Sequence, residues 1–232
     1  MVAAADLPVL AAAEVRAYRL VNSKFPPIAI FDDVAGADEF EELYALQALT
    51  NPRLANQAGR LELIPRADIP FGIPGCSYAT APFTHVNPDG SRFSDGSFGV
   101  LYLAESMDTA IAEVRYHQQA YWSNVPDLRY ERFVFRALTA RFDEGGGLDA
   151  LKVSLQDQIY LPANYDASQV LGRAALRAGA SAIRYRSVRR SGGVCWGLLT
   201  PRQVVSVVQT AHYEMIWNGE VMGVHKLSTR VG

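Results

Sequence analysis

The sequence has few residues of the kinds that bind metals or form disulfides, and it has no long apolar run. Its two cysteines, Cys76 and Cys195, lie far apart and belong to no CxxC or Cys/His cluster, which argues against a zinc site and a disulfide framework. No stretch approaches the roughly eighteen apolar residues that span a bilayer. The apolar N-terminus lacks a basic segment and carries Asp6 and Glu14, unlike a signal peptide. We therefore expect a soluble, cytoplasmic protein with no membrane contact, no metal and no bound cofactor.

Glycine-rich phosphate motifs are also missing. The run G-G-G at 145–147 has neither the spacing nor the lysine of a phosphate-binding loop, and no G-x-G-x-x-G is present to open a helix, which argues against Walker-type and Rossmann nucleotide sites. Ser187 has no G-x-S-x-G context, so a serine-hydrolase nucleophile is not expected there.

Lysine is scarce. Only three of the 22 basic residues are lysines, and the formal net charge is −2. Proteins that grip duplex DNA by neutralising roughly 6–10 phosphates show a basic excess or stripe, whereas this chain has only one basic segment, R-Y-R-S-V-R-R at 184–190. Direct nucleic-acid binding is therefore not expected. Arginine does suit a small anionic ligand, because its planar guanidinium grips phosphate or carboxylate with two hydrogen bonds.

What the sequence does contain is enough apolar residues for one sizeable core, 49% of 232 residues, so we expect a single domain over 1–232. Ser106 is a good N-cap for a helix, and Asp166 with Gln169 predicts a capping box. Strands outnumber helices, which predicts an α+β fold with a mixed, mostly antiparallel sheet flanked by helices. The expected strands are 15–21, 99–104, 130–138, 181–187 and 193–199; the expected helices are 37–49, 107–121 and 166–179; a hairpin is expected at 218–219, and a long Pro/Gly-rich insertion at about 50–90.

Three residues of different chemistry surround one short strand–helix unit. Arg92 enters the strand at 99–104, Tyr102 lies near its end, and Glu113 lies on the following helix. Taken singly, they are a loop-anchoring arginine, a core aromatic and a solvated helix residue. Because the helix must fold back beside the strand, the unit can instead gather all three into one cleft. His117 follows Glu113 by four residues on the same helix face, and we rank it below Glu113.

These residues carry a resemblance to a known family. The segment G-S-R-F-S-D-G-S-F-G-V-L-Y-L-A-E-S-M-D-T-A-I-A-E-V-R-Y-H, with A-Y-R-L-V near the start and A-I-R-Y-R-S-V-R-R-S-G-G-V-C-W near the end, resembles the RES domain, which is named for its Arg, Glu and Ser positions. The matching blocks, at about 15–21, 90–117 and 181–199, occur in the family's order, and the central block is the most specific.

The resemblance implies a fold similar to ADP-ribosyltransferase toxins and an activity that consumes NAD⁺. RES proteins are typically toxins of bacterial type II toxin–antitoxin pairs, each neutralised by a helix-turn-helix antitoxin that is expected to cover the active site. They cleave the nicotinamide–ribose bond with water or phosphate, as glycohydrolases or phosphorylases; some transfer ADP-ribose to a protein. NAD⁺ is thus a substrate.

Carried over residue by residue, the resemblance assigns Glu113, Arg92 and Tyr102 as catalytic residues. It assigns NAD⁺ binding to a set that shares the same cleft: Arg19, Arg92, Tyr102, Ser187 and His117. A carboxylate such as Glu113 stabilises the oxocarbenium-like ribose formed when nicotinamide leaves. Arginines bind the diphosphate, Tyr102 offers a π-face, and Ser187 a neutral hydrogen-bond donor.

Two other functions remain open from the sequence. The same site could belong to a protein ADP-ribosyltransferase. Alternatively, the chain could be a non-catalytic binding module whose basic segment 184–190 docks a partner or nucleic acid.

Overall fold

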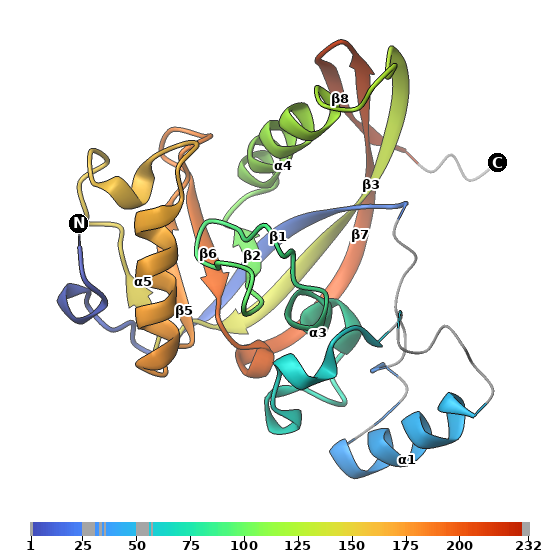
Figure 1. The fold of residues 1–232 in the computed structure, drawn as a ribbon, viewed down its shortest axis with the longest axis vertical. Helices are drawn as coiled ribbons and strands as arrows, with labels where there is room; N and C mark the ends of the chain where they lie inside the picture. The colour runs from blue at the N-terminus through green and yellow to red at the C-terminus, as the bar shows by residue number, and fades with distance from the viewer. Residues whose placement is uncertain are drawn as a thin grey trace.

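One eight-stranded sheet organises the protein (Figure 1). The computed structural model describes residues 2–24, 31–32, 34, 36–49, 56 and 58–228. The strand order is β4-β5-β6-β2-β1-β3-β7-β8, and all paired strands are antiparallel except β4 and β5. The strands are β1 (Glu14–Asn22), β2 (Leu101–Ala104), β3 (Tyr130–Asp143), β4 (Leu148–Asp149), β5 (Ala182–Arg186), β6 (Val194–Leu198), β7 (Val204–Asn218) and β8 (Val221–Leu227). The predicted α+β class with a mixed, mostly antiparallel sheet is confirmed.

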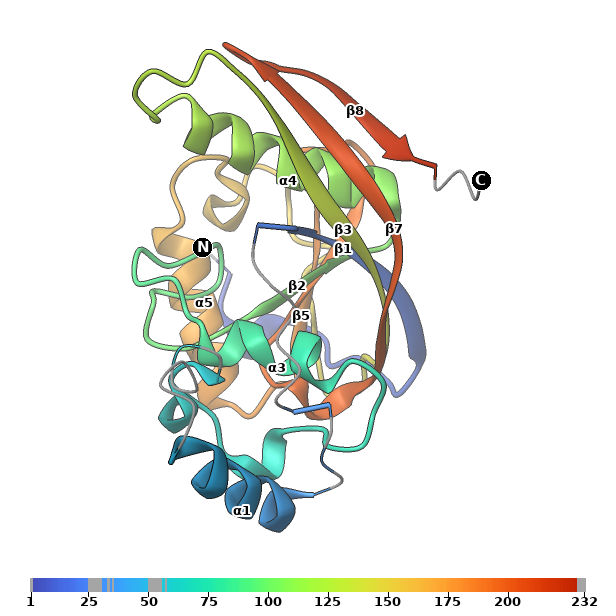
Figure 2. The same cartoon turned by 90° about the vertical axis from the view of Figure 1, so that its right-hand side faces the viewer.

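Helices cover both faces of the sheet (Figures 1 and 2). They are α1 (Ala37–Ala48), α3 (Cys76–Thr84), α4 (Met107–Trp122) and α5 (Asp166–Arg177). Alternate residues of each strand point to opposite faces, and in β2 Leu103 joins the core formed with α1 and α3, whereas Ala104 joins the core formed with α5. A third core lies between α4 and the outer strands, around Trp122 and Trp217.

The two central strands, β1 and β2, barely pair. Their register consists of one pair in the described chain, Tyr18↔Ala104. By contrast, β1 pairs with β3 along its whole length, from Glu14 to Asn22. In place of further ladder bonds to β2, the Arg19 guanidinium donates to the carbonyl of Tyr102 (Nη1–O 3.5 Å). The middle of the sheet is therefore where the backbone leaves room for side chains of both strands.

The helix that follows β2 begins where the sequence predicts. Ser106 is its N-cap, and the Ser106 hydroxyl accepts a hydrogen bond from the N–H of Thr109, satisfying one of the free N–H groups of the first turn. Helix α5 ends as predicted before Gly179, which has a positive φ of 75°, the left-handed conformation that favours glycine.

The predicted capping box at 166–169 is wrong. Asp166 is the first helical residue, and the N-cap is Tyr165, which makes no side-chain cap bond. The backbone N–H of Asp166 instead donates to the side-chain oxygen of Asn164 (2.8 Å), and the side-chain amide of Gln169 donates to the carbonyl of Ser91 (3.1 Å). The Gln169 side chain is therefore engaged in a tertiary contact with Ser91 and does not cap its own helix.

The proline-rich stretch also differs from a long loop. Residues 76–84 form helix α3, with Pro82 inside it, and the buried side chains of Cys76, Ala79 and Phe83 pack into the core shared with α1. Residues 69–75 and the segment from His85 up to β2 run without helix or strand. The part of the predicted insertion at 50–55 lies outside the described residues.

The last third contains more strand than expected. Strand β7 begins at Val204, well before the predicted hairpin, and its turn to β8 lies at Gly219 as predicted. The valines at 204, 205, 207 and 208 carry the β-branched signal for this longer strand. Within the described part of the chain, no helix is both long enough and apolar enough to cross a membrane.

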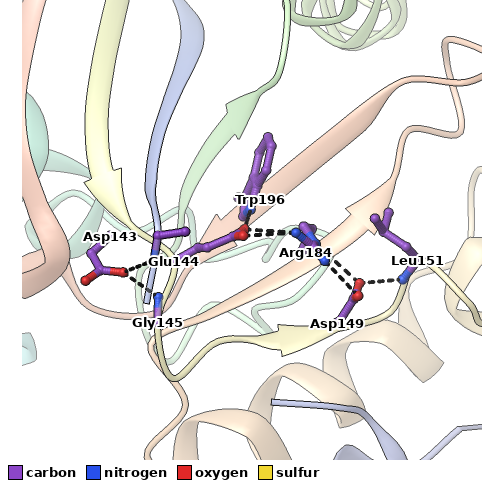
Figure 3. A network of polar contacts seen from close by, with 8 residues as sticks. Asp143, Glu144, Gly145, Asp149, Leu151, Arg184 and Trp196 are labelled. Carbon is purple, nitrogen blue, oxygen red and sulfur yellow. Dashed lines mark hydrogen bonds and ion pairs between the residues drawn. The ribbon is translucent and has the colours of Figure 1, made fainter. Parts of the chain in front are cut away.

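A buried polar network fastens the far end of the sheet (Figure 3). Arg184 on β5 donates to Glu144 (3.0 Å) and to Asp149 (2.8 Å). The indole N–H of Trp196 donates to the same Glu144 (2.8 Å), and the N–H of Leu151 donates to Asp149 (3.0 Å). The network joins the chain around β4 to β5 and β6, with each charge paired.

Candidate active site

A cavity of about 510 Å³ lies where β1 and β2 part, a volume within the range of small-molecule sites. Its walls come from β1, β2, Pro82 of α3, the segment 85–100, α4 and three residues of the later chain, Tyr165, Tyr185 and Cys195. Five of the six residues predicted for the site line it: Arg19, Arg92, Tyr102, Glu113 and His117. The sixth, Ser187, contacts one of the five.

Glu113 is held by Ser187. The Ser187 hydroxyl donates to Oε1 of Glu113 at 2.6 Å, the short distance typical of a hydroxyl on a carboxylate. Ser187 is 6% exposed and follows directly after β5. The bond therefore links α4 to the turn that follows β5. Glu113 is half-buried rather than a solvated helix residue, and its carboxylate is oriented in the cavity wall.

Tyr102 is fixed through its hydroxyl. The oxygen accepts a hydrogen bond from the N–H of Phe93 (2.9 Å) and shares another with the hydroxyl of Ser91 (2.8 Å). Burial raises the pKa of Tyr102 to about 12, although both hydrogen bonds act in the opposite direction. The phenol is therefore neutral at physiological pH and ties the segment before β2 to the strand itself.

Arg92 is buried, and within the described part of the chain it contacts carbonyls and a ring rather than a carboxylate. It is 7% exposed, and its Nη1 donates to the carbonyls of Ile159 (2.9 Å) and Leu161 (3.3 Å). Its guanidinium lies over the ring of Tyr165, 4.8 Å from the centroid, a cation–π geometry. Neutral carbonyls and a ring orient the cation without cancelling its charge, so the charge remains available to an anionic ligand.

Arg19 supplies a second cation in the same wall. Burial lowers the pKa of Arg19 to about 10, and the influence of Tyr102 opposes that shift. The guanidinium therefore stays protonated at neutral pH. With Arg92, it gives the cavity two arginines for one ligand.

His117 lies at the exposed edge of the cavity. Its pKa is lowered below 6.5 by desolvation first, and then by the nearby cations of Arg189 and Arg92. The imidazole is therefore mostly neutral at pH 7, and its ring meets that of Tyr116 edge to face at 5.4 Å.

Three tyrosines of the wall, Tyr18, Tyr165 and Tyr185, were not predicted as site residues from the sequence. Tyr165 stacks on Arg92, and Tyr185 packs edge-on against Phe93 at 4.9 Å between centroids. Burial raises the pKa of Tyr185 well above its usual value. In the sequence, Tyr185 alternates with Arg184 and Arg186, a pattern that indicates burial of Tyr185 but not a site. Tyr165 lies in the loop before α5 and has no such signal.

The basic segment 184–190 is committed to internal contacts. Arg184 belongs to the buried network, and Arg190 pairs with Asp108 (3.2 Å). Arg186 donates to the carbonyl of Val153 (2.5 Å). Arg189 stacks over Tyr116 at 3.3 Å from the centroid and donates to the carbonyl of Pro162. These contacts leave little of the segment to act as a basic docking stripe.

Both cysteines are buried thiols, although Cys195 lines the cavity. Burial raises the pKa of Cys76 to about 11 and raises the pKa of Cys195 further. Since the thiolate is the reactive form, neither is placed to act as a nucleophile. Among the described residues, no group of three or more His, Cys, Asp or Glu gathers where it could hold a metal ion.

Thiol labelling checks this inertness. Native protein at pH 8 is expected not to react with a chromogenic disulfide reagent over minutes, and both thiols are expected to react after unfolding in denaturant. A Cys76→Ala variant isolates Cys195. Rapid labelling of that variant in the native state would show that the cavity exposes a reactive thiolate.

Comparisons with known proteins identify a matching family profile, a similar sequence and a similar solved structure. The profile described as RES domain matches residues 69–218, a range that contains Arg92, Tyr102, Glu113, His117 and Ser187 but not Arg19. The uncharacterized protein y4oC of Sinorhizobium fredii (strain NBRC 101917 / NGR234) is 30% identical over 205 residues, covering 87% of this chain and 83% of that protein. A chain in the crystal structure of the M. tuberculosis MbcT-MbcA toxin–antitoxin complex matches with a TM-score of 0.43 and 13% identity, over 86% of each chain.

Proposed function

Because the chain belongs to the RES domain family, we propose that it is a toxin that cleaves the nicotinamide–ribose bond of NAD⁺. The observation that carries the proposal is the Glu113 carboxylate, fixed by Ser187 at 2.6 Å in a cavity that also contains Arg19 and Arg92. One oriented anion beside two cations suits a substrate with a diphosphate and a ribose that becomes positively charged.

In the proposed reaction the bond between C1″ of the ribose and nitrogen of nicotinamide breaks, and its electron pair leaves with neutral nicotinamide. The ribose becomes oxocarbenium-like, and Glu113 stabilises that charge. An oxygen of water or of hydrogen phosphate then forms the new bond at C1″, and the proton that the acceptor loses is released to solvent. The arginines hold the diphosphate, Tyr102 offers a ring face, and neutral His117 lines the entrance.

The second part of the proposal is a partner. Members of the family are typically neutralised by a helix-turn-helix antitoxin, and we propose that such a protein covers the cavity. Co-purification with the product of a neighbouring gene, together with loss of NAD⁺ consumption in the complex, tests this partner. A complex that consumes NAD⁺ as fast as the free chain would contradict the covering of the site.

The test of the activity is incubation of the purified chain with NAD⁺, with and without inorganic phosphate, followed by mass identification of the products. We expect nicotinamide with ADP-ribose 1″-phosphate for a phosphorylase, or with free ADP-ribose for a glycohydrolase. Label from NAD⁺ appearing on a protein band would instead indicate a protein ADP-ribosyltransferase. Unchanged NAD⁺ would overturn the proposal and favour a non-catalytic binding module.

A further inference from the structure

Glu105 lies between β2 and α4 and is not among the residues that line the cavity. Its carboxylate nevertheless accepts hydrogen bonds from two separate parts of the chain. Oε1 accepts from the hydroxyl of Thr109 (2.8 Å) and from that of Ser106 (3.3 Å). Oε2 accepts from the N–H of Val194 (2.7 Å). Bonds to a charged acceptor are among the stronger ones in proteins, so Glu105 is firmly tied on both sides.

The first side is the start of α4. Thr109 is fully buried and stands one helical turn before Glu113, on the same face. Fixing the Thr109 hydroxyl therefore fixes the rotation of α4 at the turn that precedes Glu113.

The second side is the turn that holds Ser187. Val194 begins β6 and closes this turn: its carbonyl accepts from the N–H of Glu105 (3.0 Å), and the N–H of Ser187 donates to the carbonyl of Gly193 (2.8 Å). Within the turn, the N–H groups of Arg189 (3.1 Å) and Arg190 (3.0 Å) donate to the Ser187 hydroxyl oxygen. These bonds direct the hydroxyl proton toward Glu113.

Turn and helix are also in close contact. A Cβ added at Gly193 would lie 2.9 Å from the Thr109 hydroxyl oxygen, so the turn can approach α4 only because position 193 carries no side chain. The helix that carries Glu113 and the turn that carries Ser187 are thus both held in position by the Glu105 carboxylate.

We propose that Glu105 is a positioning residue that sets the Glu113 carboxylate by holding α4 and the 187–193 turn in register. The inference rests on the proposed function, because Glu113 is the group whose position matters for it. Displacements of about 1 Å at a reacting group can cost up to about 10²-fold in rate.

Two substitutions separate this role from others. Glu105→Leu keeps the size and removes every acceptor, and we expect kcat for NAD⁺ cleavage to fall roughly 10- to 100-fold with KM little changed. Glu105→Gln is the matched control. Its amide oxygen still accepts from Val194, and its NH₂ can donate to the Thr109 hydroxyl, so kcat is expected to stay close to wild type. An equal loss in both variants would overturn the inference, because it would make the charge itself necessary.

A double-mutant comparison with Ser187→Ala shows whether Glu105 acts through that bond. In the Ser187→Ala background, Glu105→Leu is expected to cause little further loss of kcat, since coupled residues are not additive. The same loss in both backgrounds, or an unchanged kcat for Glu105→Leu, would overturn the inference. If Glu105→Leu does not fold, Thr109→Val removes the hydroxyl that donates to Glu105 (2.8 Å) and accepts from the Ser106 hydroxyl (3.1 Å), and it is expected to lower kcat in the same sense.

Amide hydrogen exchange separates this inference from the proposed function. Wild-type protein that leaves NAD⁺ intact would contradict the function alone. In that case, the backbone amides of Arg189 and Arg190 still report on the order of the 187–193 turn. These amides are expected to exchange faster in Glu105→Leu than in wild type or Glu105→Gln. Unchanged exchange of those two amides would overturn the positioning role.

Discussion

Replacing Glu113 with glutamine is expected to leave the protein folded and to lower NAD⁺ turnover by at least roughly 10²–10⁴-fold, the range of a positioned acid/base group. Glutamine has the size of glutamate, and its amide oxygen can still accept the hydrogen bond that the Ser187 hydroxyl donates at 2.6 Å. The substitution therefore removes the negative charge and little else. Since the charge is what stabilises a cationic ribose, the loss is expected mainly in kcat.

The measurement is NAD⁺ consumption under saturating substrate, with circular dichroism and thermal unfolding to show that the fold is retained. Glu42→Gln is the matched control, because Glu42 is an exposed carboxylate on α1, outside the cavity lining. This variant should consume NAD⁺ at the wild-type rate. Full turnover by Glu113→Gln would remove the assignment of Glu113 as the catalytic carboxylate.

Replacing Arg184 with methionine is expected to destabilise the protein by about 1–3 kcal/mol, the cost of leaving two partly buried carboxylates without their main hydrogen-bond donor. The side chains of Arg184, Glu144 and Asp149 are 23%, 10% and 16% exposed. Without Arg184, the Glu144 carboxylate keeps its hydrogen bond from the indole N–H of Trp196, and Asp149 keeps that from the N–H of Leu151. Two partly buried carboxylates would then lie close together without a hydrogen-bonded cation between them.

Urea unfolding of wild type and variant measures the loss. Arg141→Met is the control, because Arg141 pairs with Glu14 on the surface, where the side chains are 52% and 53% exposed, and such pairs contribute about 0–1 kcal/mol. Equal losses in the two variants would contradict a special role for the buried network.

The pH dependence of this loss has a definite sign. Burial raises the pKa of Asp149, but the bonds from Arg184 and Leu151 outweigh it, and the folded pKa is lowered overall. A carboxyl with a lowered folded pKa stabilises the protein above its unfolded pKa, about 3.9 for Asp, and loses that contribution as pH falls through the folded value. The difference between wild type and Arg184→Met should therefore be full at pH 7 and shrink below about pH 4.

The parts of the molecule that were predicted well are those set by short-range patterns. Helix α4 was predicted at 107–121 and observed at Met107–Trp122, because the Ser106 cap and the apolar spacing are both local. Arg92, Tyr102 and Glu113 lie within one strand–helix unit, so their convergence on one cavity could be anticipated from the need of α4 to pack beside β2.

The rest depends on contacts between distant parts of the chain. Gln169 bonds to Ser91 rather than to its own helix start, and Tyr165 joins the cavity wall beside Arg92, which is distant from it in the sequence. Glu105 reads in the sequence as an ordinary residue before an N-cap. Its role becomes visible only when Val194, far along the chain, is placed 2.7 Å from its carboxylate.

The strand order has a consequence for protein synthesis. Arg19, on β1, leaves the ribosome early. The strand that lies between β2 and β5 in the sheet is β6, which ends at Leu198 and is therefore made late. Chains are made from the N-terminus, and pairing of strands distant in sequence is slow. A nascent or prematurely terminated chain that stops before Ser187 has Glu113 but not the hydroxyl that orients it. Most of the chain must therefore be synthesised before the cavity can assemble, and chains that end before Ser187 are expected to be inactive.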